Sequence, residues 1–189
     1  MYTPETITVY QAHPVPVALA AARAGRFVPP FQPDRMSWLK PSFRWMMYRS
    51  QWATASGQER ILAVEITREG FEWALAHSCL AQYDHNFYPD RDDWCAKLKS
   101  SPVRFQWEPE RSLRMAPLPY RALQVGLGVE VIDKFVGEWT VGIEDITHAA
   151  RRIGDLVRRG DEHRAGMMLP DERPYPLPGS LAAALHISI

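Results

Sequence analysis

The sequence lacks the features that mark several large classes of protein. Only two cysteines, Cys79 and Cys95, occur in 189 residues. Neither belongs to a CxxC pair, which excludes a secreted disulfide framework and suits a reducing cytosol. No apolar run approaches the roughly 18 residues that cross a bilayer, and residues 1–10 lack the pattern of a signal peptide. We therefore expect a cytoplasmic protein without a membrane partner.

The chain also has no excess of positive or negative charge, and it lacks the common catalytic motifs. The chain has 22 basic and 22 acidic residues, a net charge of zero, so no overall field attracts nucleic acid or membrane. It contains no Gly-rich phosphate loop, no GxSxG and no HExxH. The six histidines are not spaced as metal ligands with cysteines or acids, so we expect no metal site.

What the chain does contain is an ordinary globular composition, with 46% hydrophobic residues in helical and strand patterns. Strands are predicted at Ile7–Ala12, Arg60–Thr67, Val103–Trp107, Arg121–Leu127 and Glu138–Ile146. Helices are predicted near Val17–Ala24, Glu69–Leu80, Arg91–Lys99, Val129–Val136 and Ile146–Val157. This order predicts an α+β (mixed α/β) fold with one mostly antiparallel or mixed sheet of about five or more strands and flanking helices.

The prolines near the end of the chain suggest a surface tail. Residues 1–165 are expected to form a single globular domain, and residues 166–189 a Pro-rich tail that packs on it. The last stretch, Leu181–Ile189, is apolar enough to dock.

The densest segment is Met36–Trp52, which combines aromatic and basic residues. A helix from Ser42 is favoured over a strand, and Pro41 keeps Lys40 extended. Five bases and one acid, Glu59, lie between positions 35 and 60; the bases are Arg35, Lys40, Arg44, Arg49 and Arg60. Cations interleaved with aromatics suit a phosphate joined to a flat ring. The alternative is a solvated rim whose arginine stems cover core aromatics.

Two further positions have both a chemical and a structural interpretation. Glu144 and Asp145 end a predicted strand, where an acid can orient a ribose or act as a base. Either can instead cap the helix that follows, which is the favoured interpretation for Asp145. His13 precedes a predicted helix, where capping is expected.

The sequence resembles the bacterial domain-of-unknown-function family 4291 from about Ile7 to about Ile153. The resemblance is carried by VYQA (Val9–Ala12), MSWLKPSFRWMMYRSQWAT (Met36–Thr54), GQERILAVEI (Gly57–Ile66), VRFQWEPE (Val103–Glu110), YRALQVGL (Tyr120–Leu127) and EWTVGIEDIT (Glu138–Thr147). One departure is His13, where the family pattern is expected to have tyrosine. The family implies no activity.

The order of the predicted elements is also similar, more distantly, to ADP-ribosyltransferase-like folds. That resemblance implies NAD as cofactor, a catalytic group of Gln11, Lys40, Arg49 and Glu144, and cofactor contacts from Tyr10, Trp38, Arg44, Tyr48 and Ser50. The glutamate would bind the ribose hydroxyl and stabilise an oxocarbenium-like transition state. A departure is Gln11, which replaces the usual Arg or His of the first strand.

Three hypotheses follow. The first is a nucleotide-handling, ADP-ribosyltransferase-like enzyme, which requires Gln11, Lys40, Arg49 and Glu144 to converge. The second is a nucleic-acid-binding module with a basic and aromatic groove. The third is a non-catalytic protein, in which Trp38, Trp45 and Trp52 are all buried and no cleft lies beside Lys40. The sequence does not indicate the oligomeric state.

Overall fold

Two β-sheets organise the computed structural model, which describes residues 1–185. The first sheet is antiparallel and has the order β1 (Thr6–His13), β3 (Arg60–Thr67), β7 (Thr140–Asp145). The second has the order β2 (Ser37–Leu39), β6 (Pro117–Leu127), β5 (Val103–Arg111), β4 (Ser78–Leu80), with only β4 and β5 parallel. They meet where the backbones of Tyr10 and Lys40 exchange two hydrogen bonds of 2.8 and 3.1 Å.

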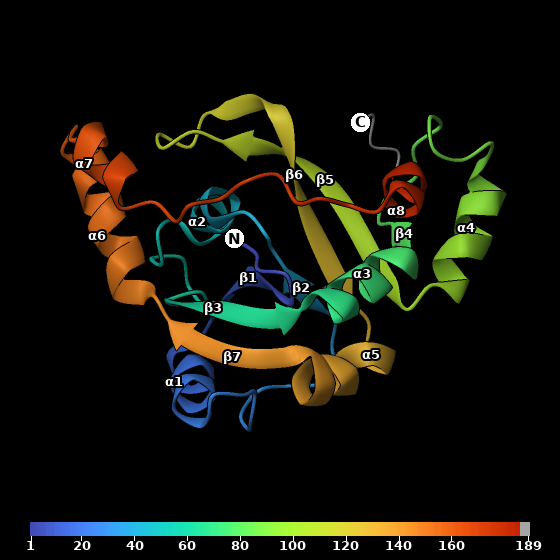
Figure 1. The fold of residues 1–189 in the computed structure, drawn as a ribbon, viewed down its shortest axis with the longest axis horizontal. Coiled ribbons are helices and arrows are strands. Elements are labelled where there is room, and N and C mark those ends of the chain that lie inside the picture. Colours follow the sequence, from blue (N-terminus) through green and yellow to red (C-terminus); the bar gives the residue numbers. More distant parts are fainter. Residues whose placement is uncertain (186–189) are drawn as a thin grey trace.

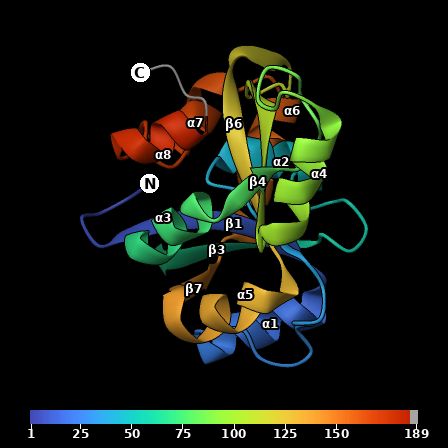
Figure 2. The same cartoon turned by 90° about the vertical axis from the view of Figure 1, so that its right-hand side faces the viewer.

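Helices surround the two sheets (Figures 1 and 2). They are α1 (Val15–Ala24), α2 (Phe43–Ser50), α3 (Arg68–Ala76), α4 (Arg91–Ser100), α5 (Val129–Lys134), α6 (Thr147–Arg158), α7 (Glu162–Met167) and α8 (Gly179–Ala184), with a π-helical turn η1 (Phe135–Trp139) after α5. This is an α+β single-domain fold, as predicted, but its strands form two sheets where a single sheet was expected.

The core forms two clusters, one on each face of the first sheet. Side chains alternate between the faces of a strand. Val9 and Leu62 therefore join the larger cluster, whereas Tyr10 and Ile61 join a smaller one with α2, Trp52 and α6. The smaller cluster fixes α2 against the strand that leads into the candidate site.

Local signals explain most of the predicted elements. Gly25 ends α1 with a left-handed φ of 65°, which glycine adopts without strain. Ser42 accepts a hydrogen bond from Trp45 N and starts α2, which confirms the helix predicted from this residue. Residues 37–39 form a short strand that was not predicted.

Several predicted boundaries are wrong. The strand predicted to end at Trp107 continues to Arg111, and the strand predicted from Arg121 begins at Pro117, because the two pair along this whole length. The helix predicted to reach Leu80 ends at Ala76, and residues 78–80 form the edge strand β4. The strand predicted from Glu138 begins at Thr140, because residues 135–139 form the π-helical turn.

The C-terminal segment crosses the molecule from α7 to α8, in front of α2 and the second sheet (Figure 1). Residues 168–178 contain no helix or strand. Leu185 is buried in the larger core cluster, so this part of the tail docks; residues 186–189 of the expected apolar end lie outside the described residues. Within residues 1–185, no helix combines the length and hydropathy that a membrane crossing requires.

Candidate functional site

Lys40 lies at the junction of the two sheets, directly after β2. Its backbone is held by Tyr10, and Pro41 follows it. The residue is only 8% exposed, and no hydrogen bond or ion pair of its side chain is present among residues 1–185. Its ammonium group is not among the fully buried atoms that lack a partner, so it reaches solvent through the cavity that it lines. Buried charges are normally paired because desolvation of an isolated ion is costly. An unpaired buried lysine is therefore the most unusual feature of this region.

Lys40 faces a cavity of about 480 Å³, which we call the Lys40 cavity. It is enclosed by the end of β1, the start of α1, the loop before β2, and β2 itself. The lining residues are Gln11, Ala12, His13, Pro14, Val17, Pro30, Phe31, Gln32, Arg35, Met36, Ser37, Trp38, Lys40, Met46 and Gln58. None of them is acidic, so the cavity carries two cations and no internal counter-ion.

The electrostatics of the cavity follow from this imbalance. Burial lowers the pKa of Lys40 to about 8, and the nearby positive charge of Arg49 contributes in the same direction. Burial also lowers the pKa of His13 to about 4, helped by the charges of Arg35 and Lys40. At neutral pH the cavity therefore combines a protonated lysine with a neutral imidazole.

Gln11 links β1 to β2 beside this lysine. Its Nε2 donates hydrogen bonds to Ser37 Oγ (2.7 Å) and to the Trp38 carbonyl (3.2 Å). Its Oε1 lies 3.3 Å from His13 Nε2. Gln11 thus positions the strand that carries Trp38 and Lys40.

Trp38 is half-buried and forms part of the cavity wall. Arg49 is exposed on α2 and does not line the cavity, although its charge acts on Lys40. By contrast, Trp45 and Trp52 are buried. The third hypothesis required three buried tryptophans and no cleft beside Lys40; the structure shows one half-buried tryptophan and a cavity.

Four predicted cofactor contacts do not reach the Lys40 cavity. Tyr10 is buried against Phe43, and burial together with the charge of Glu172 raises the pKa of its hydroxyl. Ser50 is buried and donates to the Met46 carbonyl. Tyr48 stacks on Trp45 at a centroid distance of 5.0 Å. Arg44 donates to the Tyr120 hydroxyl (3.0 Å) and lines a different cavity.

Glu144 is not brought to the Lys40 cavity either. The strand register aligns Tyr10, Ala63 and Glu144 in one row and Gln11, Leu62 and Asp145 in the next. Directly opposed residues share a face of a sheet, and successive residues alternate. The exposed Glu144 and the buried Gln11 therefore lie on opposite faces of the first sheet.

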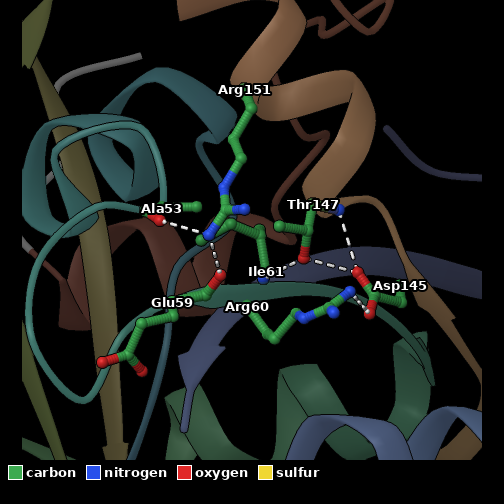
Figure 3. A network of polar contacts seen from close by, with 7 residues as sticks. All are labelled: Ala53, Glu59, Arg60, Ile61, Asp145, Thr147 and Arg151. Carbon is green, nitrogen blue, oxygen red and sulfur yellow. Dashed lines mark hydrogen bonds and ion pairs between the residues drawn. The ribbon is translucent and has the colours of Figure 1, made fainter. Parts of the chain in front are cut away.

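Asp145 has a structural role (Figure 3), but it is not the cap residue of α6, which is Ile146 and makes no side-chain cap hydrogen bond. Its carboxylate accepts hydrogen bonds from the backbone N and the hydroxyl of Thr147 at the start of α6, and it pairs with Arg60 at 3.1 Å. Thr147 Oγ1 in turn accepts from Ile61 N, and Arg151 donates to the carbonyls of Ala53 and Glu59. This network fixes α6 to β3 and to the loop after α2.

Sequence reasoning gave His13 and Phe31 no role in a site. His13 was expected to cap α1, but α1 has no side-chain cap, and the imidazole instead packs against Phe27 and Phe31. The alternation of side chains along β1 could have indicated that His13 lies near the site, because His13 is two residues after Gln11 and therefore shares its face. No group of three acidic, histidine or cysteine side chains within residues 1–185 is arranged to hold a metal ion.

A comparison with models of known protein families covers the whole of this region. The family model described as "Domain of unknown function (DUF4291)" matches residues 1–175. The chain belongs to the DUF4291 family. Both the Lys40 cavity and the tail residues up to Tyr175 lie inside the matched part of this DUF4291 protein. No curated protein matches the chain.

Proposed function

We propose that this DUF4291 protein binds an anionic nucleotide in the Lys40 cavity, with a phosphate group against Lys40. The observation that carries the proposal is a largely buried lysine that lines the cavity and whose ammonium group has no acidic partner among residues 1–185. A phosphate oxygen would supply the missing counter-charge through charge-assisted hydrogen bonds. Arg35, on the same cavity, adds a second cation.

The remaining lining groups suit the rest of a nucleotide. Trp38 and Phe31 offer aromatic surface for a base or a nicotinamide ring, and the amides of Gln32 and Gln58 offer donors and acceptors. The volume of about 480 Å³ lies in the range of about 300–1,000 Å³ that is usual for small-ligand sites.

NAD is the first nucleotide to test, because the more distant resemblance implies it. ADP-ribosyl transfer also requires a carboxylate beside the ribose, and none of the described residues that line the cavity is acidic. We therefore propose NAD binding as the function of this cavity and treat transfer as a separate step. Glu144→Gln should leave NAD affinity unchanged, because Glu144 does not line the cavity.

A nucleic-acid groove is less well supported, because two of the three tryptophans that would form its stacking surface are buried. Short RNA and DNA oligomers nevertheless belong in the same experiment. Binding of an oligomer that exceeds the affinity of every mononucleotide and dinucleotide would favour that alternative.

The test is isothermal titration calorimetry of the full chain with NAD, ATP and inorganic pyrophosphate. Loss of a charge-assisted hydrogen bond costs about 1.5–3 kcal/mol, so Lys40→Met should weaken nucleotide binding by about 10-fold or more. The matched control is Lys97→Met, a change at an exposed lysine on α4. Equal affinities of wild type and Lys40→Met for every ligand that binds would refute the proposal.

A further inference from the structure

A second cavity lies beneath the C-terminal segment, on the other side of the β1–β2 junction. We call it the tail cavity; its volume is about 570 Å³. While Lys40 faces the first cavity, the residues that follow it, Pro41, Ser42 and Arg44, line the second. Residues 172–175 and Leu177 line it from the segment that crosses in front of the second sheet in Figure 1.

The covering segment is held in place by specific contacts. The Tyr175 hydroxyl donates to Glu72 (2.6 Å) and accepts from Arg68 Nε (2.8 Å). Its ring also packs edge-on against Phe71. The roof of the cavity is therefore anchored to α3.

The tail cavity contains two carboxylates without an ion-pair partner among residues 1–185. Glu110 is only 6% exposed, and one of its oxygens accepts from Arg111 N (2.7 Å). Glu172 accepts from Phe43 N (2.7 Å) at the start of α2. Each carboxylate keeps a second oxygen for which no hydrogen-bond donor is present in this part of the chain.

Glu110 and Glu172 line the same cavity, and the charge of one acts on the other. Burial raises the pKa of Glu172 to about 7, and the negative charge of Glu110 adds to this effect. The Phe43 N–H, the amino group of Met1 and the guanidinium of Arg44 act in the opposite direction. A positively charged group placed between the carboxylates would relieve both the repulsion and the desolvation.

The rim of the same cavity has the opposite charge. Arg44 uses one nitrogen on the Tyr120 hydroxyl (3.0 Å) and has no acidic partner within residues 1–185. Arg121 lies over the Trp107 ring, with 5.2 Å between its guanidinium carbon and the ring centroid. Between these polar groups the wall is apolar and includes Phe71, Leu75 and Leu123.

We infer that the tail cavity binds a small zwitterion of the amino-acid type. Its ammonium group would lie between Glu110 and Glu172, its carboxylate on Arg44, and its apolar side chain against Trp107 and Phe71. This arrangement gives Glu110, Glu172 and Arg44 an opposite charge, which neither a simple cation nor a simple anion achieves. The other cationic groups on the cavity, the Met1 amino group, Arg121 and Arg173, surround this position. The inference uses residues other than those of the Lys40 cavity and does not depend on nucleotide binding.

Three related probes test the two charges separately by calorimetry at pH 8, where Glu172 is largely ionised. L-Phenylalanine carries both charges, 2-phenylethylamine lacks the carboxylate, and 3-phenylpropionate lacks the ammonium group. L-Phenylalanine should bind at least 10-fold more tightly than either analogue. Glu110→Gln and Glu172→Gln preserve shape and should each weaken it by at least 10-fold, whereas Lys40→Met should have no effect.

The location of binding is read from the tryptophan indole signals in a ¹H–¹⁵N spectrum. The Trp107 signal should shift on addition of L-phenylalanine and the Trp38 signal should not, because only Trp107 lines the tail cavity. Melting temperatures of the variants confirm that they are folded. Failure of L-phenylalanine, L-leucine and L-tryptophan to bind at millimolar concentration overturns the inference. Undiminished binding to folded Glu110→Gln and Glu172→Gln variants overturns it as well.

Discussion

Replacing Lys40 with methionine should stabilise the ligand-free protein at neutral pH. Lys40 is 8% exposed and unpaired, and its pKa falls from an ordinary 10.5 to about 8. Each pKa unit corresponds to about 1.4 kcal/mol, so keeping the side chain protonated in the folded state costs about 3 kcal/mol at pH 7. Methionine is apolar and fills a similar volume, so it removes this cost without opening a cavity.

The sign of the pH dependence follows from the direction of the shift. Between pH 8 and 10.5 the unfolded chain holds the lysine proton and the folded chain has released it, so wild-type stability rises with pH in this window. The advantage of Lys40→Met should therefore fall from about 3 kcal/mol at pH 7 to about 1 kcal/mol at pH 10.

The assay is equilibrium urea unfolding of wild type, Lys40→Met and the control Lys97→Met at both pH values. Lys97→Met should stay within about 0.5 kcal/mol of wild type, as is usual for surface substitutions. The reasoning is refuted if Lys40→Met is less stable than wild type at pH 7, or if the difference does not change with pH.

Three other substitutions test neighbouring parts of the account. The folded pKa of His13, about 4, lies below the ordinary 6.5, so the unfolded chain takes up the proton first and wild-type stability should fall as the pH drops from 6.5 to 4. His13→Phe should lessen this fall in urea unfolding, and an unchanged pH profile of stability contradicts the prediction. For Glu172, whose folded pKa of about 7 lies above the ordinary 4.5, the stability present below pH 4.5 is lost as pH rises through 7. Glu172→Gln should therefore be more stable than wild type at pH 8, by up to about 3 kcal/mol, and nearly equal to it at pH 4.5; equal stability at both values argues against the burial of an ionised Glu172. Asp145→Ala removes the hydrogen bonds to Thr147 and the ion pair with Arg60 and should cost about 1–2 kcal/mol, while NAD affinity stays constant. A selective loss of NAD binding in a stable variant would instead place Asp145 in the site.

Local signals made much of the fold predictable. Pro14 and Gly25 bracket α1, Ser42 starts α2, and the β-branched run Arg60–Thr67 forms β3 with the predicted bounds. The short strands β2 and β4 were missed, because three residues show no periodicity and both strands depend on pairing with distant partners.

The candidate site was predictable only in part, for a related reason. Gln11 and Lys40 were named from their residue types, and the pairing of Tyr10 with Lys40 brings both to one cavity. Glu144 was named because an acid at a strand end is chemically useful. Its face depends on the register of β1, β3 and β7, and a shift of one residue would have reversed it. Sequence reasoning has no access to that register.

The most direct test of the central claim is the titration of Lys40 itself, with and without a nucleotide. The chain has only four lysines, at positions 40, 97, 99 and 134, so ¹³C-lysine labelling gives a simple spectrum in which the Lys40 Cε signal is assigned with Lys40→Met. The account predicts a pKa of about 8 in the free protein and a rise of at least one unit on saturation with NAD or another bound nucleotide, because a phosphate stabilises the protonated form. A Lys40 pKa near 10.5 in the free protein, or one that bound nucleotide leaves unchanged, would contradict the account.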